Sequence, residues 1–537
     1  MLFNSFVFIG CFLPLVLAGF LLLARGGHHR LTATWLTAAS LFFYGWWNPR
    51  YVPLLIASMV FNYLVGGVLA RRPTKSLLIL GIAANLALLG YFKYTGFAVA
   101  TADQLFGLDW TVPHILLPLA ISFFTFQQIA YLSDAHDGLA VEHDFLNYSL
   151  FITFFPHLIA GPITHHREML PQFADPDTFR PRWSNMSVGG TLFVIGLFKK
   201  VMIADVFGAY ARPIFDSAAS VAALSFFEAW TGALAYTLQI YFDFSGYTDM
   251  AIGLGLLFGI SLPPNFNSPY KARSIIEFWS RWHMTLTRFL TAYIYNPIVL
   301  RMTRARMAKG LPLPRRGRMT LGTFASLVAF PTILTMFLSG FWHGAGWQFI
   351  MFGLIHGVCL VINHGWRQWK KSRGLPATSD NPLIIAASVA TTFLCVVVGL
   401  VFFRAADVPA ALNLLAGMVG LHGVDLPSSF VKIPGVEGVA AFFGLGFAEL
   451  YLFSPQMTAG IALMLVAVWT LPNSQQWLRN YRTALDTQPP LNWLQKHLSA
   501  AIWRPSVAGG FLAGWLCFFV LLRAMSAAPT EFLYFQF

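Results

Sequence analysis

Apolar residues follow one another along this chain in stretches of about 20, the length that an α-helix needs to cross a hydrocarbon core roughly 30 Å thick. The stretches are continuous rather than alternating, which favours helices over a barrel, because backbone groups in lipid must be hydrogen-bonded within their own segment. The pattern therefore predicts an all-α, polytopic integral membrane protein with about a dozen crossings. The predicted spans, several of them too short or too polar to cross alone, are 4–24, 31–47, 51–70, 76–92, 111–133, 145–163, 186–208, 222–243, 246–262, 319–341, 345–366, 381–403, 436–453, 457–471 and 506–525.

Composition and charge agree with a membrane protein. Of the 537 residues, 57% are apolar and only 11% are charged, whereas an ordinary globular domain is roughly 25% charged. The net charge is +13, and its basic residues collect in the loops 301–318 and 367–373. The positive-inside rule places both loops in the cytoplasm and the N-terminus on the outer side. Attraction to anionic lipid headgroups explains these loops; docking of a polyphosphorylated cytosolic donor is the alternative, and no motif indicates nucleic-acid binding.

No metal site is predicted from the spacing of potential ligands. The four cysteines, Cys11, Cys359, Cys395 and Cys517, all lie in apolar runs without C-x-x-C spacing, which indicates small buried side chains. The histidines show no H-E-x-x-H spacing.

Polar side chains inside apolar stretches carry the chemical information, because a bilayer makes them costly and they usually face a cavity, a partner or a substrate path. They gather in four segments: "FFPHLIAGPITHHREMLPQF" (154–173), "LQIYFDFSGYTDMAIGLG" (238–255), "PPNFNSPYKARSIIEFWSRWHMTLTRFL" (263–290) and "LSGFWHGAGWQFIMFGLIHG" (338–357). The candidate site residues are His343 and His283 as catalytic groups, with His356, Trp342, Asp243, Trp279 and Trp282 in supporting or substrate-binding roles.

Each supporting residue also has a structural interpretation. His356 is equally typical of a helix-packing histidine that a backbone carbonyl satisfies. Asp243 and Asp249 suit interhelical hydrogen bonds that lock the bundle, although a functional Asp243 would line a cavity beside the histidines. Trp279 and Trp282 suit an interfacial aromatic belt.

His343 stands apart because of its neighbours. It lies between Gly340, Gly344 and Gly346, and glycines permit close backbone approach and interrupt a helix. The pattern predicts a break in the helix or a thinned wall at His343, where a ligand can come near. An imidazole in such a place can accept a proton from a hydroxyl or thiol and return it. His283 supplies a second imidazole, and two histidines indicate proton transfer.

Two of these segments resemble the signature regions of the membrane-bound O-acyltransferases: "EFWSRWHMTLTRFL" (277–290) and the 338–357 segment. Further segments are similar to the bacterial branch that acetylates exopolysaccharides such as alginate, over most of the first 370 residues and the extreme C-terminus. They are "MLFNSFVFIGCFLPLVL" (1–17), "LPLAISFFTFQQIAYLSD" (117–134), the 154–173 segment, "YFDFSGYTDMAIGLGLLFGISLPPNFNSPY" (241–270) and "EFLYFQF" (531–537).

The resemblance implies that His343 is the family's catalytic histidine, that His283 occupies the second active-site position, and that His356 matches a less certain family histidine. It implies a ring of helices around a tunnel, in which a cytosolic thioester donor, acetyl-CoA by expectation, meets an acceptor from the other side of a bacterial inner membrane. The acyl group would pass to a periplasmic or extracellular partner transferase that modifies the polysaccharide. We expect a catalytic core over 1–375 and further transmembrane helices over 376–537, because polar residues inside apolar stretches become rare beyond residue 375.

Three alternatives remain open at this stage. One is a lipid or polysaccharide transporter that uses buried Asp and His as an ion relay, although no internal repeat supports it. Another is a haem protein with axial histidines. The third is teichoic-acid D-alanylation, with a carrier protein as donor. Topology poses its own question: two cytoplasmic basic loops make 319–366 a two-span hairpin, with His343 near its turn, either re-entrant or at the bottom of a funnel.

Overall fold

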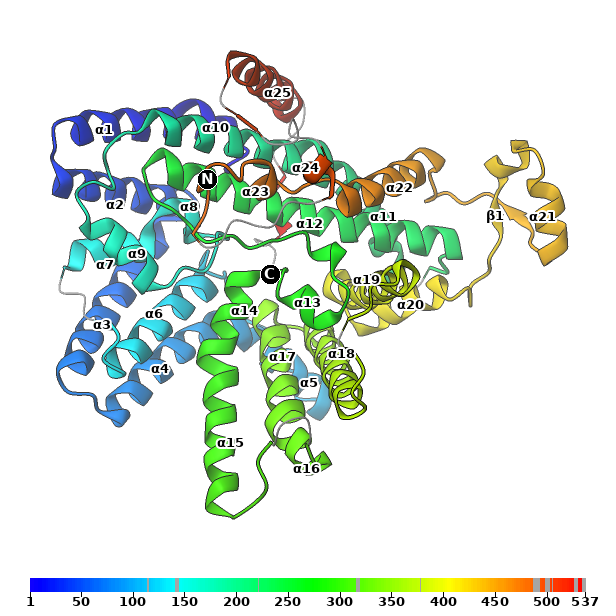
Figure 1. The fold of residues 1–537 in the computed structure, drawn as a ribbon, viewed down its shortest axis with the longest axis horizontal. Coiled ribbons are helices and arrows are strands. Elements are labelled where there is room, and N and C mark those ends of the chain that lie inside the picture. Colours follow the sequence, from blue (N-terminus) through cyan, green and yellow to red (C-terminus); the bar gives the residue numbers. More distant parts are fainter. Residues whose placement is uncertain are drawn as a thin grey trace. The chain divides into compact units, whose positions relative to one another are not determined.

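The computed structural model describes residues 1–113, 115–140, 144–220, 222–314, 319–376, 378–485, 493–497, 503–504, 506–525 and 530–533. Helices dominate these residues (Figure 1), and their only strands are a parallel pair of two residues each, β1 (Leu426–Pro427) and β2 (Phe447–Ala448). The all-α prediction is confirmed. By internal contacts the chain forms two compact units: unit 1 comprises Met1–Met202, Asp243–Asn265 and Ser474–Phe537, and unit 2 comprises Ile203–Phe242 and Phe266–Asn473. The boundary predicted near residue 375 separates a catalytic core from further transmembrane helices, and this division stays a prediction.

Unit 1 holds both ends of the chain. Its helices are α1 (Leu13–Arg25), α2 (His29–Gly45), α3 (Val52–Arg71), α4 (Lys75–Leu89), α5 (Thr95–Phe106), α6 (Ile121–His136), α7 (Phe145–Thr153), α8 (Phe155–Leu158), α9 (His166–Ala174), α10 (Trp183–Phe198), the end of α12 (Phe226–Leu257), α23 (Ser474–Trp477), α24 (Trp493–His497) and α25 (Val507–Met525). Short 3-10 or π-helical turns at Val7–Phe12, Pro49–Tyr51, Gly90–Tyr94 and Lys199–Ala204 adjoin them.

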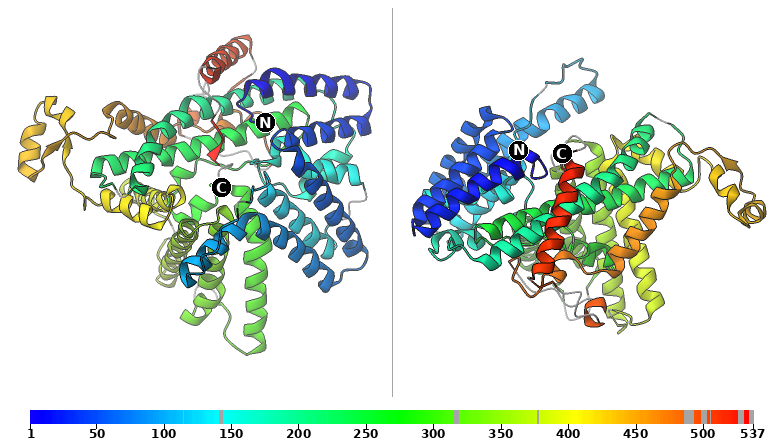
Figure 2. Two further views of the ribbon diagram at one scale, coloured as in Figure 1. Left: turned by 180° about the vertical axis from the view of Figure 1, so that it is seen from behind. Right: turned by 90° about the horizontal axis from the view of Figure 1, so that it is seen from above.

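Unit 2 holds the histidine-bearing segments. Besides β1, β2 and the start of α12, it contains α11 (Asp205–Ala219), α13 (Ile275–Trp279), α14 (Met284–Leu290), α15 (Asn296–Ala308), α16 (Leu321–Phe324), α17 (Phe330–His343), α18 (Trp347–Ser372), α19 (Pro382–Arg404), α20 (Val408–Met418), α21 (Val436–Phe443) and α22 (Pro455–Thr470). Its 3-10 and π-helical turns are Pro269–Lys271, Thr291–Tyr295, Ala325–Ala329 and Ser428–Lys432. Figure 2 shows the ribbon from two further directions.

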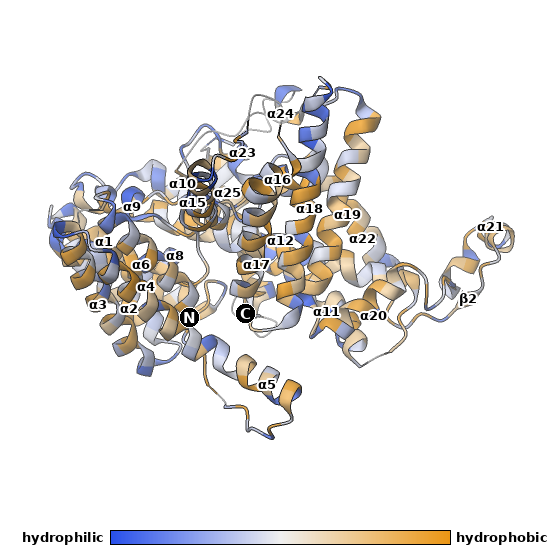
Figure 3. Cartoon of the chain, turned by 90° about the horizontal axis from the view of Figure 1, so that it is seen from below, coloured by the Kyte–Doolittle hydropathy of each residue, from blue (hydrophilic) through white to orange (hydrophobic). Residues whose placement is uncertain are grey.

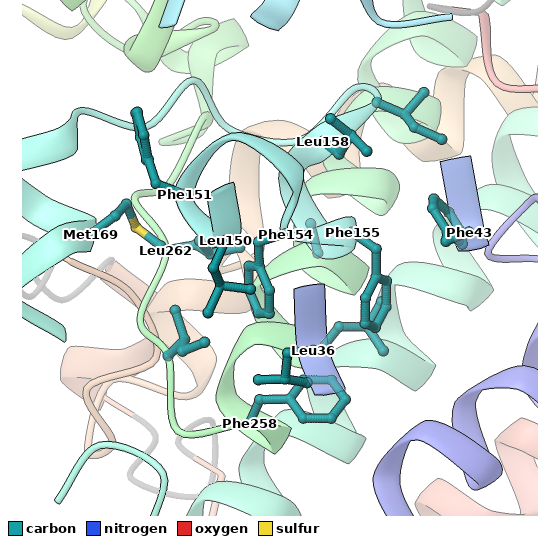
Figure 4. Close-up of a cluster of buried hydrophobic side chains, with 14 of the residues drawn as sticks. Leu36, Phe43, Leu150, Phe151, Phe154, Phe155, Leu158, Met169, Phe258 and Leu262 are labelled. Atoms are coloured by element: carbon teal, nitrogen blue, oxygen red, sulfur yellow. The ribbon is translucent and has the colours of Figure 1, made fainter. Parts of the chain in front are cut away.

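Aromatic packing forms the core of unit 1. Figure 4 shows Phe154 and Phe155, at the start of α8, beside Phe258, which follows α12. The Phe258 ring meets those of Phe154 and Phe155 edge-on, at centroid distances of 6.3 and 5.7 Å. All three side chains are fully buried. Such pairs stabilise a core beyond their buried area, so this contact ties α8 to the end of α12.

A buried amide network joins α3, α4 and α6. Asn62 Nδ2 donates to Asn85 Oδ1 (3.1 Å) and Gln128 Oε1 (2.9 Å), Asn85 Nδ2 donates back to Asn62 Oδ1 (2.7 Å), and Ser58 Oγ donates to Gln128 Oε1 (2.8 Å). Polar groups in hydrocarbon are costly unless paired. The network therefore fixes which faces of these three helices meet.

Glycines let α10 and α12 pack backbone to backbone. A Cβ on Gly196 would lie 2.4 Å from the Gly246 carbonyl oxygen, and one on Gly189 would lie 2.6 Å from that of Gly253. The pairs recur seven residues apart on each helix, as small residues do at close helix contacts in membranes. No larger residue fits at these positions without moving a helix.

Seven helices of the described residues are long and apolar enough to cross a membrane, fewer than the dozen crossings expected. They are Val7–Arg25, Pro49–Arg71, Lys75–Phe106, Leu321–His343, Trp347–Ser372, Pro382–Arg404 and Val507–Met525. Figure 3 shows mostly apolar residues along α17, α18 and α19, three of these helices. The chain has the character of a multi-pass membrane protein.

Four predicted spans were wrong. The spans 222–243 and 246–262 form one helix, α12. Asp243 and Asp249, near the expected break, are buried and paired with lysines rather than exposed in a loop. The span 145–163 is broken after Thr153, where Pro156 offers no backbone N–H and its ring opposes the carbonyl four residues earlier. The span 436–453 holds only α21, followed by β2.

The glycine contacts of α10 predict a difference between two adjacent positions. Gly189→Val should lower the stability of the protein by about 1–3 kcal/mol, the usual cost of overpacking, because its side chain meets the α12 backbone. Gly190→Val changes the helix propensity by the same amount, and no atom lies within 4 Å of a Cβ at this position. Thermal unfolding of both variants in detergent measures this. Equal losses of stability would contradict the proposed backbone contact.

Candidate functional site

His343 is the last residue of α17, at the turn of a helical hairpin. The helix ends there because Gly344 is extended (φ −162°, ψ 156°), and α18 begins at Trp347. The two helices pack closely through glycine: a Cβ on Gly340 would lie 2.2 Å from the Phe349 carbonyl oxygen and 3.0 Å from the Cα of Gly353. The predicted hairpin, the helix break and the close backbone approach are all confirmed.

Aromatic rings enclose the His343 imidazole, which is only 6% exposed. Its ring centroid lies 4.9 Å from that of Trp342, 5.9 Å from that of Phe352 and 5.1 Å from that of Phe403, each in an edge-on arrangement. Edge-on contacts constrain the orientation of a ring. The imidazole is therefore held in one direction in surroundings that exclude water.

His283 occupies a strained turn. It precedes α14 with φ 42° and ψ 52°, a left-handed conformation that residues other than glycine seldom adopt. Such strain persists only where the surrounding structure imposes it, and it concentrates at functional sites. The His283 side chain is 1% exposed, and burial lowers the pKa of its imidazole to about 3. His283 is thus neutral at physiological pH.

Trp342 links the two histidines. Its indole centroid lies 6.5 Å from the imidazole of His283 and 4.9 Å from that of His343. The structure therefore brings together the two residues predicted to be catalytic, with Trp342 next to both. Their catalytic roles remain predictions.

His356 lies on α18 among aromatic rings. Trp279 Nε1 donates a hydrogen bond to its Nδ1 (3.3 Å), and Phe352 packs edge-on against it at 4.7 Å. Gly399 of α19 covers its other nitrogen, since a Cβ there would lie 2.4 Å from Nε2. These are the contacts of a helix-packing histidine, with an indole N–H in place of the expected backbone carbonyl.

Trp279 and Trp282 are both buried, 5% and 7% exposed, which does not fit a lipid-facing aromatic belt. Trp282 stacks on Phe278 at 5.6 Å and meets Phe266 edge-on at 5.0 Å. Trp279 holds α14 through its carbonyl oxygen, which accepts from Thr287 Oγ1 (3.0 Å). Both indoles thus support the turn that carries His283.

Asp243 belongs to unit 1, whereas the histidines belong to unit 2. Its Oδ1 accepts from Lys200 Nζ (2.7 Å), and its Oδ2 accepts from the backbone N–H of Leu533 (3.0 Å). Asp249, two turns later, pairs with Lys199 at 2.6 Å. The carboxylates therefore serve the locking role considered above, and a substrate role for Asp243 stays a prediction.

A cavity of about 410 Å³ opens beside the His283 turn. Pockets of this size hold small ligands or parts of larger ones. Its lining mixes hydroxyl, amide and guanidinium groups with apolar surface. The lining residues are Trp279, Ser280, Met284, Thr287, Arg288, Thr291, Ala292 and Asn296. Within the described part of the chain, no group of three His, Cys, Asp or Glu side chains is placed to hold a metal ion.

Several residues that line the site were not predicted from the sequence. Phe352 lies one turn before His356 on the same face, so helical spacing signals it. Phe403 and Gly399 come from α19, far along the chain, and no local pattern signals their contacts with His343 and His356.

Comparison with known proteins gives consistent results. Residues 139–311 match the model of MBOAT, the membrane-bound O-acyltransferase family. The chain is 42% identical over 458 residues to a peptidoglycan O-acetyltransferase of Helicobacter pylori, covering 79% of this chain and 81% of the relative. It is 36% identical over 465 residues to a probable alginate O-acetylase AlgI of Pseudomonas aeruginosa, covering 83% and 82%. A teichoic acid D-alanyltransferase of Streptococcus thermophilus is 29% identical over 294 residues, covering 53% and 68%.

The turn after His343 yields a second steric prediction. Gly344→Ser should destabilise the hairpin by about 1–3 kcal/mol, because its Cβ would lie 2.1 Å from the buried Phe349 ring. Gly346→Ser is the matched control: its Cβ meets only the end of the flexible Gln348 side chain, and serine is a favourable residue before a helix. Unfolding midpoints in detergent compare the two. A Gly346→Ser protein as unstable as Gly344→Ser would refute the ring contact as the cause.

Proposed function

Because this chain belongs to the membrane-bound O-acyltransferase family and is an O-acyltransferase, we propose that it moves an acetyl group from a cytosolic thioester across the membrane for O-acetylation of a cell-envelope polysaccharide. Two relatives support the acetyl group and the polymer class: the peptidoglycan O-acetyltransferase and the probable alginate O-acetylase, each covering about four-fifths of the chain. The observation that carries the proposal is the pair of buried histidines that both lie next to Trp342.

In the proposed mechanism, His343 acts as general base. Its neutral nitrogen takes the proton of the acceptor hydroxyl while the oxygen attacks the thioester carbonyl. The C–S bond then breaks, and His343 returns the proton to the leaving thiolate. The acceptor gains the acyl group as an ester, and the donor leaves as a thiol. The aromatic enclosure of His343 suppresses the competing hydrolysis by keeping water out.

His283 stabilises the charge that develops on the carbonyl oxygen. A neutral imidazole has one N–H to donate, and the depressed pKa keeps His283 neutral throughout the physiological range. A hydrogen-bond donor fixed before the reaction starts needs no reorganisation as charge forms. The strained turn and the two buried indoles supply that fixation.

Acetyl-CoA is the proposed donor, and the cavity beside His283 is the place where part of it would bind. We also propose that the chain lies in a bacterial inner membrane with its N-terminus outside and its basic loops in the cytoplasm. The α17–α18 hairpin then carries His343 at the end remote from those loops, which suits delivery of the acyl group to the outer side. A soluble partner transferase there would complete transfer to a polymer.

Removal of the histidines tests the assignment. His343→Ala should abolish polymer-linked ester, since loss of a general base costs about 10²–10⁴ in rate. His283→Ala should reduce the rate by about 10²–10³, as loss of an oxyanion donor does. His356→Ala should retain much of the ester. The measurement is base-released ester per cell at matched membrane protein levels. Full ester content in His343→Ala would overturn the catalytic role and favour a transporter, and a Soret band in purified protein would favour the haem alternative.

A second experiment tests the donor. Inverted membrane vesicles that contain the protein should incorporate label from [¹⁴C]acetyl-CoA into thiol-resistant, base-labile ester, and vesicles with His343→Ala should not. Retention of a small acidic carrier protein on purification, with no use of acetyl-CoA, would replace the acetyl donor by the carrier-linked donor of a D-alanylation reaction. The catalytic role of His343 would survive that result.

A further inference from the structure

A second cavity lies in unit 1, far along the sequence from the histidines, between α10 and α25. Its volume is about 480 Å³, within the range of ligand sites. Its deeper wall is apolar, and Thr191 presents no free donor to it, because its hydroxyl donates to the Ser187 carbonyl (2.8 Å). The lining residues are Thr191, Val194, Ile195, Trp477, Trp503, Arg504, Ser506, Gly509, Leu512, Ala513 and Leu516.

Aromatic side chains gather at one end of this cavity. The backbone N–H of Trp503 donates to the Trp477 carbonyl (2.9 Å), and the two indole centroids are 6.5 Å apart. Tyr481 meets Trp503 edge-on at 5.4 Å. Indoles and phenols prefer the level of the lipid headgroups, where one end of the ring is apolar and the other is wet. Trp477 and Tyr481 are partly exposed, so they mark this end of the cavity as the headgroup level, whereas Trp503 is buried and packs against both.

Positive charge occupies the same end. Arg504 is exposed and lines the cavity, and Arg479 and Arg482 lie in the segment that carries Trp477 and Tyr481. None of the ion pairs within the described ranges involves these three arginines. A guanidinium group binds the oxygens of a phosphate in pairs. The N-terminus of α25 adds its partial positive charge beside Arg504.

The helix that forms one wall has little protein around it. Of the apolar stretch of α25, only 6% is buried, and Figure 2 shows this helix in red, lying outside the other helices of its unit. The remaining surface is available to lipid. An acyl chain that lies along Val194, Leu512 and Leu516 would fill the gap between α25 and α10 without leaving the hydrocarbon region.

We propose that this cavity binds one anionic glycerophospholipid, with its phosphate at Arg504, its glycerol beside the indoles and an acyl chain between α10 and α25. Charge selects the headgroup, because each basic residue near the membrane surface favours an anionic over a neutral lipid several-fold. The bound lipid takes the place of protein contacts in holding α25. The site is independent of the histidines.

Native mass spectrometry of the full-length protein tests the proposal, with phosphatidylglycerol and phosphatidylcholine supplied at equal concentration. The wild type should retain one phosphatidylglycerol about fivefold over phosphatidylcholine. Arg504→Gln should remove this preference, and Ala513→Phe, which fills the groove, should remove the bound lipid altogether. Arg523→Gln, at the other end of α25, removes the same charge and should change nothing.

Four results would overturn the proposal. They are equal retention of the two lipids by the wild type, a loss of preference in Arg523→Gln as large as in Arg504→Gln, lipid retention by Ala513→Phe, and displacement of phosphatidylglycerol by millimolar inorganic phosphate. The last would indicate a phosphate site without an acyl chain. Unfolding midpoints measured in parallel establish that the variants are folded, and ester content need not change with any of them.

Discussion

The free-energy cost of leaving a polar group unpaired in hydrocarbon determines much of this structure. It makes the backbone helical, and it favours partners for polar side chains in apolar segments. Asn62, Asn85 and Gln128 form side-chain hydrogen bonds across three helices. Lys200 and Asp243 form a buried pair that also holds the backbone of Leu533. These pairs specify which helix faces meet, a task that apolar contacts alone perform poorly when lipid is equally apolar.

In the histidine site, two buried imidazoles have different surroundings. His356 receives a hydrogen bond from Trp279, whereas His343 is surrounded by ring edges at the end of a helix. The indole N–H of Trp279 holds the first imidazole, and ring packing constrains the second. Glycines allow the second arrangement, since Gly340 and Gly353 bring α17 and α18 close enough for Phe352 to reach the imidazole. Ring edges on three sides thus constrain the orientation of the His343 imidazole.

The positions of the histidines and aspartates help to distinguish acetyl transfer from transport. An ion relay for transport needs titratable groups arranged along a path, whereas here the two predicted catalytic histidines lie together around one tryptophan. Asp243 and Asp249, the acidic groups that such a relay would use, are paired with Lys200 and Lys199. The D-alanyltransferase relative covers less of the chain, and at lower identity, than the O-acetyltransferases. These observations favour acetyl transfer.

The sequence by itself determined the all-α membrane class, the hairpin around His343 and the helix break at that residue, because hydrophobic run length and glycine position act locally. It also identified the histidine segments, since charge and polarity stand out in apolar runs. Only the tertiary structure decided that α12 is unbroken, because Lys199 and Lys200, 43 or more residues earlier in the chain, pair with its aspartates. It likewise decided that Phe403 and Gly399 of α19 face His343 and His356. Contacts between distant segments depend on how the helices pack, which no local pattern encodes.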